Sequence, residues 1–338
     1  MVDIPRDSAV PTRELAGSSG AEGRRPLEWP SSHRHIDDIF RLIVTAFGAV
    51  LIALVALIAF ALWQGSAEAR STFGFGFVTS SDWDPVAGTF GAAPYIFGTI
   101  VTSAVALLIA GPIGIGTAIF LTELAPRWLR APVGFLVEML AAIPSIIYGL
   151  WALFALVPVV RNTVEPFLEG RLGFLPIFTG PKYGVGLLAA SLILTIMVLP
   201  TITAISRAVL ETVPPSQRDG AYALGATRWE VAAQITFPAA RAGITGAMIL
   251  GLGRALGETM AVTIVIGNRG NIGTSLFALG DTMASVIANQ FSEASFPLYT
   301  SALVEIGLLL FVLTILLNLA ARLLIWRTSG AHSMGRHA

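Results

Sequence analysis

Long apolar stretches separated by shorter polar segments dominate the chain. A helix needs about 20 apolar residues to cross the roughly 30 Å hydrocarbon core of a bilayer. Six stretches meet this length, and they cover residues 39–63, 95–122, 132–160, 183–207, 241–267 and 300–326. The pattern therefore predicts an all-α polytopic membrane protein with six transmembrane helices.

The composition supports this prediction. The 338 residues are 54% hydrophobic and 12% charged, whereas soluble domains carry about 25% charged residues. The chain has no cysteine, and its four histidines lie outside the apolar stretches. These counts exclude disulfides and thiolate sites, and they argue against a buried histidine site for a metal or for acid–base chemistry. A net charge of zero gives no bulk attraction to nucleic acid.

Basic residues are distributed unevenly between the two sides of the predicted membrane domain. Thirteen lie on the side that carries both termini, and five lie on the other side. The thirteen are Arg6, Arg13, Arg24, Arg25, Arg34, Arg41, Arg127, Arg130, Arg218, Arg228, Arg322, Arg327 and Arg336, and the five are Arg70, Arg161, Arg171, Lys182 and Arg269. Because cytoplasmic loops are enriched in Arg and Lys, both termini are expected in the cytoplasm.

The segments outside the core follow from this orientation. Residues 1–38, rich in Pro, Ser, Gly and charge, are predicted to form a disordered cytoplasmic leader. The stretch 39–63 is too long and begins too late for a signal peptide, so we expect an uncleaved first transmembrane helix. Residues 64–94 form an external segment, and residues 328–338 form a cytoplasmic tail.

Helix breakers interrupt several of the stretches. The second contains G-P-I-G-I-G at 111–116, the third contains Pro144 and the fourth contains Pro200. A proline removes one backbone hydrogen bond, which is costly in lipid unless neighbouring groups replace it. Two interpretations stay open: ordinary kinks in a packed bundle, or bent helices around a cavity that opens and closes.

Residues 219–238 form a polar, helix-forming patch between two apolar stretches, on the predicted cytoplasmic side. Pro215 suits the first turn of a short helix over 216–224, and Gly225 suits the left-handed position after its end. Thr227 and Glu230 have the spacing of a capping box, which predicts a second helix. Pro238 is expected to end that helix.

The same patch carries apolar side chains that exceed what a free loop needs. They are Trp229, Val231, Ala232, Ile235 and Phe237. One interpretation is a docking surface for a soluble partner, and the other is a helix lying on the bilayer. Membrane-surface helices are rich in Lys and Arg, whereas Asp219 and Glu230 flank this patch, so the sequence favours the partner.

The fifth stretch contains charged residues near its centre. Arg254 and Glu258 are four residues apart, so on one continuous helix they share a face and can pair. Because an arginine at mid-bilayer costs about 2.5–3.5 kcal/mol, it is expected to face a partner or a water-filled route. One hypothesis is a neutralised pair that fixes packing. The other is a guanidinium, among the glycines at 251, 253 and 257, that receives an oxyanion through forked hydrogen bonds.

Two further acids, Glu138 and Glu305, lie in the third and sixth stretches. We expect each to form hydrogen bonds between helices, and we do not expect either to bind substrate. The chain has no metal-ligand cluster and no G-x-x-x-x-G-K-[ST] sequence for binding nucleotide phosphates.

The patch resembles the E-A-A loop of ABC importer permeases, with its spacing of E-A-A, three residues, Gly, nine residues and Ile-x-Leu-Pro. The matching positions here are Asp219, Gly220, Ala221, Gly225, Ile235, Phe237 and Pro238, with Trp229 inside the same loop. The resemblance implies that this loop docks in a groove of a separate ATPase subunit. ATP and Mg²⁺ would then be bound by that partner, with no cofactor in this chain.

Other segments are similar to a narrower family, the C-type permeases of the Pst phosphate importers. The matching segments are G-F-G-F-V-T-S-S-D-W-D-P-V (74–86), F-G-A-A-P-Y-I-F-G-T (90–99), F-L-T-E-L-A-P (120–126), A-A-I-P-S-I-I-Y-G-L-W (141–151) and G-R-A-L-G-E-T-M-A-V (253–262). The match covers about residues 73 to 327. It implies a type I ABC importer (MetI-like) permease core over 95–327, with a coupling loop at 214–240.

The resemblance further implies a non-catalytic subunit of the bacterial cytoplasmic membrane. Its partners would be a homologous A-type permease, an ATPase dimer and an external phosphate-binding protein. Arg254 and Glu258 would lie on the phosphate pathway. Three alternatives stay open: a sulfate or molybdate permease, an ion-coupled carrier with Glu138, Glu258 and Glu305 as a proton relay, and a membrane scaffold or sensor.

Overall fold

The computed structural model describes residues 32–330, and the chain divides into two units, residues 1–56 and 57–338. In its described part, the first unit is the beginning of α1 (Ser32–Gly65), an apolar helix. Most of the predicted leader and the residues after Gly330 therefore lie outside the described part of the chain. Residues 32–38, predicted to belong to the leader, are instead the first residues of α1, so that boundary is wrong.

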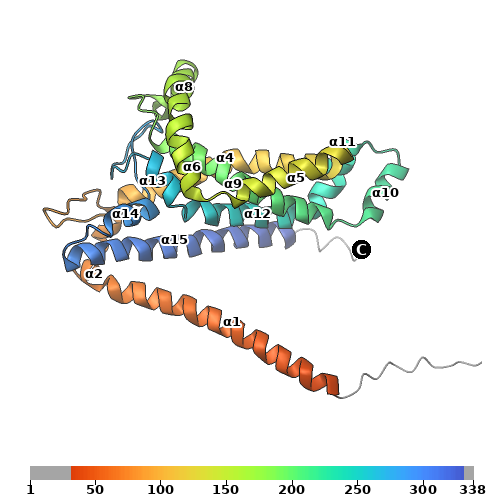
Figure 1. Cartoon of the computed structure of the whole chain (residues 1–338), viewed down its shortest axis with the longest axis horizontal. Helices are drawn as coiled ribbons and strands as arrows, with labels where there is room; N and C mark the ends of the chain where they lie inside the picture. The colour runs from red at the N-terminus through yellow and green to blue at the C-terminus, as the bar shows by residue number, and fades with distance from the viewer. Residues whose placement is uncertain (1–31, 331–338) are drawn as a thin grey trace, which may run out of the picture. The chain divides into compact units, whose positions relative to one another are not determined.

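The second unit is helical, apart from an isolated antiparallel bridge between Asp84 and Thr89. After α1 the elements are α2 (Ala67–Phe73), α3 (Gly76–Thr79), α4 (Ala93–Ile119), η1 (Phe120–Leu124), α5 (Arg127–Ala142), α6 (Ser145–Trp151), η2 (Ala152–Leu156), α7 (Val157–Val159), η3 (Val160–Val164), α8 (Glu165–Leu172), η4 (Pro176–Phe178), α9 (Leu187–Glu211), α10 (Pro215–Ala223), α11 (Arg228–Glu230), η5 (Val231–Thr236), α12 (Phe237–Leu256), α13 (Met260–Val265), α14 (Met283–Gln290) and α15 (Pro297–Gly330). In Figure 1, α10 and α11 lie at one end of this unit, and α8, α13 and α14 lie at the other.

Six helical runs in the described residues are long and apolar enough to cross a membrane. They are Asp37–Gly65, Ala93–Leu124, Ser145–Leu172, Leu187–Glu211, Arg228–Leu256 and Pro297–Leu323. The all-α prediction with six spans is confirmed. The first, second, fourth and sixth runs coincide with predicted stretches, whereas the third and fifth do not.

The third predicted stretch, 132–160, is broken at Pro144. The proline ring disfavours helical geometry at Ile143, which is extended at φ −69° and ψ 129°. Residues before the break belong to α5, and the spanning run begins at Ser145. The prolines at 112 and 200 have no such effect, since α4 and α9 continue through them.

The fifth predicted stretch, 241–267, is displaced toward the N-terminus. The helix begins at Arg228 and ends at Leu256, and α13 follows after a break. Pro238 does not end the helix, which corrects the prediction. The proline lies in the first turn of α12, directly after the π-helical turn η5. At this position the proline does not interrupt the run, which continues to Leu256.

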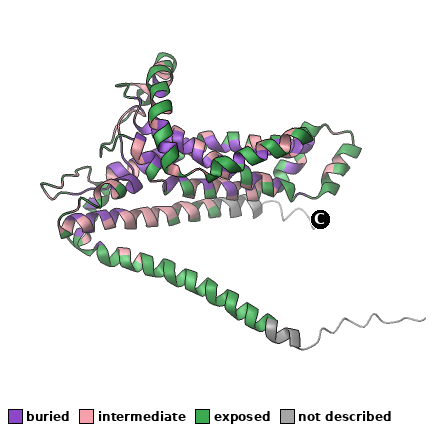
Figure 2. Cartoon of the chain, viewed as in Figure 1, coloured by how far each residue is buried: buried purple, intermediate pink, exposed green. Residues whose placement is uncertain are grey.

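Helix α9 lies at the centre of the second unit. Among the most apolar 18 residues of each spanning helix, 67% are buried in α9, 33% in the span of α4, and 28% in the spans of α12 and α15. Figure 2 shows the contrast. Glycines bring the neighbours close. A Cβ on Gly114 of α4 would lie 3.0 Å from Ile202 of α9, and one on Gly251 of α12 would lie 2.9 Å from Val198. Such small residues let helix backbones approach in a membrane, so α4, α9 and α12 form a tight core.

Residues 64–94, predicted as an external segment, pack against α4, α14 and α15 within the second unit. Trp83 donates from Nε1 to Gln290 Oε1 at 2.7 Å, and its ring lies edge-on to Tyr95. Arg70 of α2 lies 3.9 Å from the buried carboxylate of Glu305 in α15. Glu305 therefore joins two helices through an ion pair, whereas a hydrogen bond between helices was expected.

Candidate functional site

The first candidate site is the α10–α11 hairpin, whose turn is built by Gly225. This residue has φ +86°, in the left-handed region that glycine adopts without strain. The N–H of Gly225 donates to the carbonyl of Tyr222 at 2.9 Å, and that of Ala226 donates to the carbonyl of Ala221 at 3.1 Å. These two bonds form a Schellman motif, which satisfies carbonyls at the end of α10. The prediction for Gly225 is confirmed.

The second arm of the hairpin begins with the predicted capping box. Thr227 Oγ1 accepts from the N–H of Glu230 at 3.3 Å, and Glu230 Oε2 accepts from the N–H of Thr227 at 2.7 Å. Pro215 lies in the first turn of α10, as expected. Local sequence therefore determines both ends of this hairpin.

The hairpin exposes large apolar side chains. Trp229 is 65% exposed, and Leu224, which the sequence argument did not single out, is 91% exposed. Tyr222 is also exposed and was also missed. Both lie at the end of α10 directly before the turn at Gly225, and this position in the sequence is the signal that could have identified them.

The other predicted contact residues divide into two groups. Asp219, Gly220, Phe237 and Pro238 are exposed, and Ala221 and Ile235 are half-buried. Val231 and Ala232 are buried inside the chain, so they cannot contribute to a docking surface and that prediction is wrong. The cause is η5, which turns these two residues inward.

The second candidate site is the break between α12 and α13. Gly257 ends α12, and Glu258 lies in the non-helical segment before α13. Arg254 and Glu258 therefore do not share a helix face, and no ion pair joins them in the described chain. Glu258 Oε1 instead accepts from the N–H of Ala261 at 3.4 Å, in the first turn of α13. The predicted pairing is wrong, because it assumed a continuous helix.

Arg254 lies on the last turn of α12 and is exposed. The hydroxyl of Tyr148 in α6 lies within electrostatic range of the Arg254 charge. That hydroxyl donates to the carbonyl of Leu140 at 2.7 Å, across the break at Pro144. The helices that follow the two breaks, α6 and α13, pack against each other. Tyr148 belongs to the Y-G-L-W segment, but its hydrogen bond to Leu140 was not predicted from the sequence.

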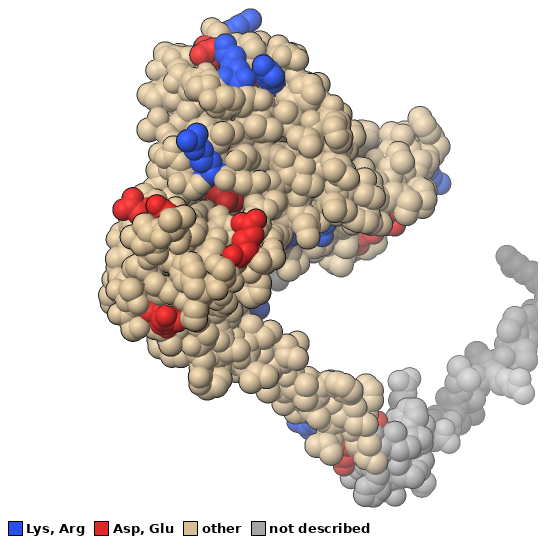
Figure 3. Space-filling model, turned by 60° about the vertical axis from the view of Figure 1, so that its left-hand side comes forward, with Lys and Arg blue, Asp and Glu red and all other residues tan. Residues whose placement is uncertain are grey.

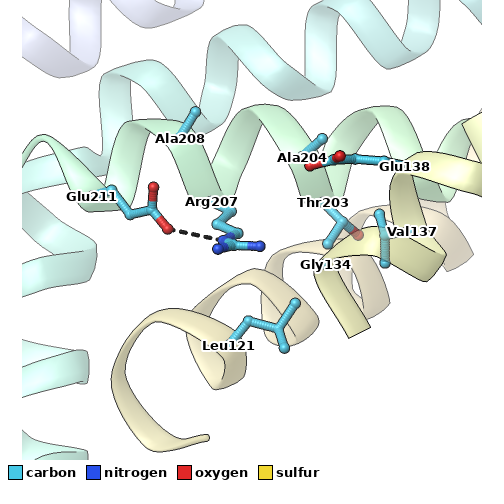
Figure 4. A pocket seen from close by; sticks show the side chains of 9 residues that line it. All are labelled: Leu121, Gly134, Val137, Glu138, Thr203, Ala204, Arg207, Ala208 and Glu211. Atoms are coloured by element: carbon cyan, nitrogen blue, oxygen red, sulfur yellow. Dashed lines mark hydrogen bonds and ion pairs between the residues drawn. The ribbon is translucent and has the colours of Figure 1, made fainter. Parts of the chain in front are cut away.

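Glu138 of α5 lines a cavity of about 200 Å³ on the side of α9 (Figure 4). Arg207 projects into the same cavity and pairs with Glu211 at 2.8 Å. Gly134 makes room for this guanidinium, which a Cβ at that position would overlap. Within the described residues Glu138 has no hydrogen bond, so the expected inter-helix bond is not present.

The end of the unit opposite the hairpin carries charges of both signs. In Figure 3, basic side chains gather over α8 and the loop that follows it, where Arg171 and Lys182 lie, and acidic side chains gather below them. Lys182 pairs with Glu169. Because the signs are mixed, this surface gives no single electrostatic field.

Comparison with known proteins agrees with this architecture. The family model described as "Binding-protein-dependent transport system inner membrane component" matches residues 110–330. The phosphate transport system permease protein PstC of Mesorhizobium japonicum is 51% identical over 295 residues, covering 86% of this chain and 90% of the relative. The protein of the same name from Haemophilus influenzae is 48% identical, covering 86% and 93%.

Solved structures support the fold. The chain superposes on a bacterial ABC transporter involved in alginate import with a TM-score of 0.57 and 20% identity, covering 87% of this chain and 99% of the other. The fold is therefore that of ABC importer permeases, as predicted. The chain is an integral membrane transport component that belongs to the family of binding-protein-dependent transport system inner membrane components.

Proposed function

We propose that this chain is the C-type permease subunit of an ATP-driven importer of inorganic phosphate. The observation that carries the substrate assignment is 51% identity to a phosphate transport permease over 86% of the chain. The chain would pair with a homologous A-type permease to form one pathway. An ATPase dimer would bind ATP and Mg²⁺, and an external binding protein would deliver phosphate.

Arg254 is proposed as the phosphate ligand in the pathway. Its guanidinium is exposed at a helix break, and Glu258 does not neutralise it. A guanidinium offers forked donors that match two oxygens of a phosphate. Nothing lies within 4 Å of the position that a Cβ on Gly253 would take, so there is open space beside the guanidinium. Glu258, which accepts from the N–H of Ala261 in α13, would keep the two helix ends in place and add a repulsion that keeps phosphate binding weak.

The α10–α11 hairpin is proposed as the surface that the ATPase binds, in the cytoplasm together with both termini. Its support is the exposure of Tyr222, Leu224 and Trp229, since exposed aromatic and aliphatic clusters are typical of contact sites. Asp219, Gly220 and Ala221 would lie at the contact edge. No covalent step is assigned to the permease itself.

The test measures uptake of labelled phosphate in cells that lack their own importer and express all four subunits. Arg254→Gln should lower uptake by roughly a hundredfold, because about 3 kcal/mol of charge-assisted hydrogen bonding is lost. Arg322→Gln removes an exposed arginine of α15 and serves as the matched control. Uptake at the wild-type level in Arg254→Gln, with the complex intact, would refute the assignment.

The same assay separates the alternatives. Competition by sulfate or molybdate stronger than by phosphate would assign another oxyanion. Uptake that persists without the ATPase and follows the proton gradient would identify an ion-coupled carrier. Undiminished uptake after deletion of the chain would leave only a scaffold or sensor role.

A further inference from the structure

Glu123 is a buried acid with no role in the two candidate sites. It lies in η1, the π-helical turn that ends the run of α4, and its side chain is 5% exposed. A buried carboxylate is costly unless a positive charge lies beside it. Here the partner comes from the hairpin: Nε of Arg218, in α10, lies 3.1 Å from Oε1 of Glu123.

Arg218 makes a second contact with the transmembrane core. Its Nη2 donates to the carbonyl of Leu210 at 2.8 Å, in the last turn of α9. The last carbonyls of a helix have no partner within the helix, and a cation there is favoured by the helix dipole. A single guanidinium therefore connects α10 to the ends of both α4 and α9.

Few other contacts hold α10 to the core. No residue of α10 is buried, although the helix also packs against η5. Arg218 is half-buried, and its side chain points inward while those of Tyr222 and Leu224 are exposed. The outer face of the hairpin is thus free for a partner, and the inner face is attached through Arg218.

The two helices that Arg218 reaches are themselves closely packed. Gly114 of α4 leaves just enough room for Ile202 of α9, as described above. Both residues belong to the buried interface between the two helices. Movement passed to either helix is therefore expected to move both, because cores at this packing density transmit displacement.

We propose that the Arg218–Glu123 ion pair is the link through which movement of the hairpin reaches α4 and α9. Both are positioning residues: they do not touch phosphate, and they keep α10 attached to the spans when the ATPase pulls or pushes it. The proposal rests on the proposed function. Its distinct content is that this pair is needed for coupling between hydrolysis and transport, and is not needed for assembly.

The test uses the complete four-subunit complex with its binding protein, reconstituted in proteoliposomes. Three quantities are measured: the ATPase retained on purification, the rate of ATP hydrolysis, and the phosphate transported per ATP. Arg218→Met keeps the length of the side chain and removes its donors. Glu123→Gln keeps the shape and removes the charge, and it serves as the milder second variant.

We expect both variants to retain the ATPase and to transport roughly tenfold less phosphate per ATP, because each leaves one buried partner uncompensated. The double variant should be no worse than the single ones, as for residues that act as a unit. Arg322→Met is the matched control, since Arg322 is an exposed arginine of α15, outside the hairpin. Its phosphate per ATP should stay within about twofold of wild type.

Two outcomes would overturn the proposal. The first is a normal ratio of phosphate to ATP in both variants. The second is loss of the ATPase in both, which would show that the pair only keeps the hairpin folded. If the proposed function itself is wrong, the result is distinguishable, because the wild-type complex would then transport no phosphate.

Discussion

Replacing Gly225 by valine tests whether the backbone geometry of the hairpin determines its binding to the ATPase. At φ +86° a residue with a Cβ is strained, and nothing lies within 4 Å of the position that this Cβ would take. Steric contact inside the chain therefore adds nothing, and the effect is conformational. The left-handed conformation costs an L-residue about 1–2 kcal/mol, and a β-branched residue is at the upper end.

This cost translates into a measurable loss of binding. If the hairpin must leave the Schellman geometry, the conformer that presents Leu224 and Trp229 becomes roughly 5- to 30-fold less populated, and the apparent affinity falls by the same factor. Asparagine is the matched control, because it has a similar volume and tolerates positive φ. Gly225→Asn is expected to bind nearly as wild type does.

The assay is co-purification of the ATPase with tagged permease from cells that express the whole complex, followed by dilution to measure dissociation. Retention should fall in Gly225→Val and persist in Gly225→Asn. Equal retention in both variants would refute the backbone argument. Equal loss in both would assign the effect to a clash with the ATPase surface.

Two further predictions concern stability, and both are measured by thermal unfolding of the purified complex. Gly251→Ala should lower the melting temperature, since overpacking against Val198 costs about 1–3 kcal/mol. Gly246→Ala on the same helix places its methyl group in open space and should leave the melting temperature unchanged. Equal effects of the two substitutions would contradict the packing argument. Burial raises the pKa of Asp281 from 3.8 to about 6, so the folded chain holds a proton there that the unfolded chain releases. Stability should then fall by about 3 kcal/mol as the pH rises from about 4 to about 6, and Asp281→Asn should remove this component; an unchanged pH dependence in that variant would contradict it.

Local features of the hairpin could be predicted from the sequence because they depend on neighbouring residues. The turn at Gly225 and the capping box of Thr227 and Glu230 each involve groups within a few positions. Their geometry needs no tertiary contact to be favourable. The inward turn of Val231 was not predictable in this way, because it depends on the π-helical turn and on the core beneath it.

Prolines show why the ends of the spans were harder to predict. Pro144 is exposed and interrupts the helix between α5 and α6, whereas Pro200 is buried in α9 and that helix continues. Both remove the same hydrogen bond. Pro112 is exposed as well, yet α4 continues through it, so neither a proline nor its exposure shows by itself where a span ends. The break at Gly257 was not predicted because α13 is itself apolar and extends the hydrophobic stretch beyond the end of α12.

The two candidate sites are connected by α9 and α12. The hairpin is attached to the end of α9 through Arg218, and α9 packs against α12 through Gly251. Arg254 follows Gly251 by less than one turn of the same helix, so its position depends on where α9 holds α12. A displacement of the hairpin therefore needs no element other than these two helices to reach the guanidinium. We expect Gly251→Ala, which spreads them, to weaken phosphate uptake more than its effect on stability alone explains.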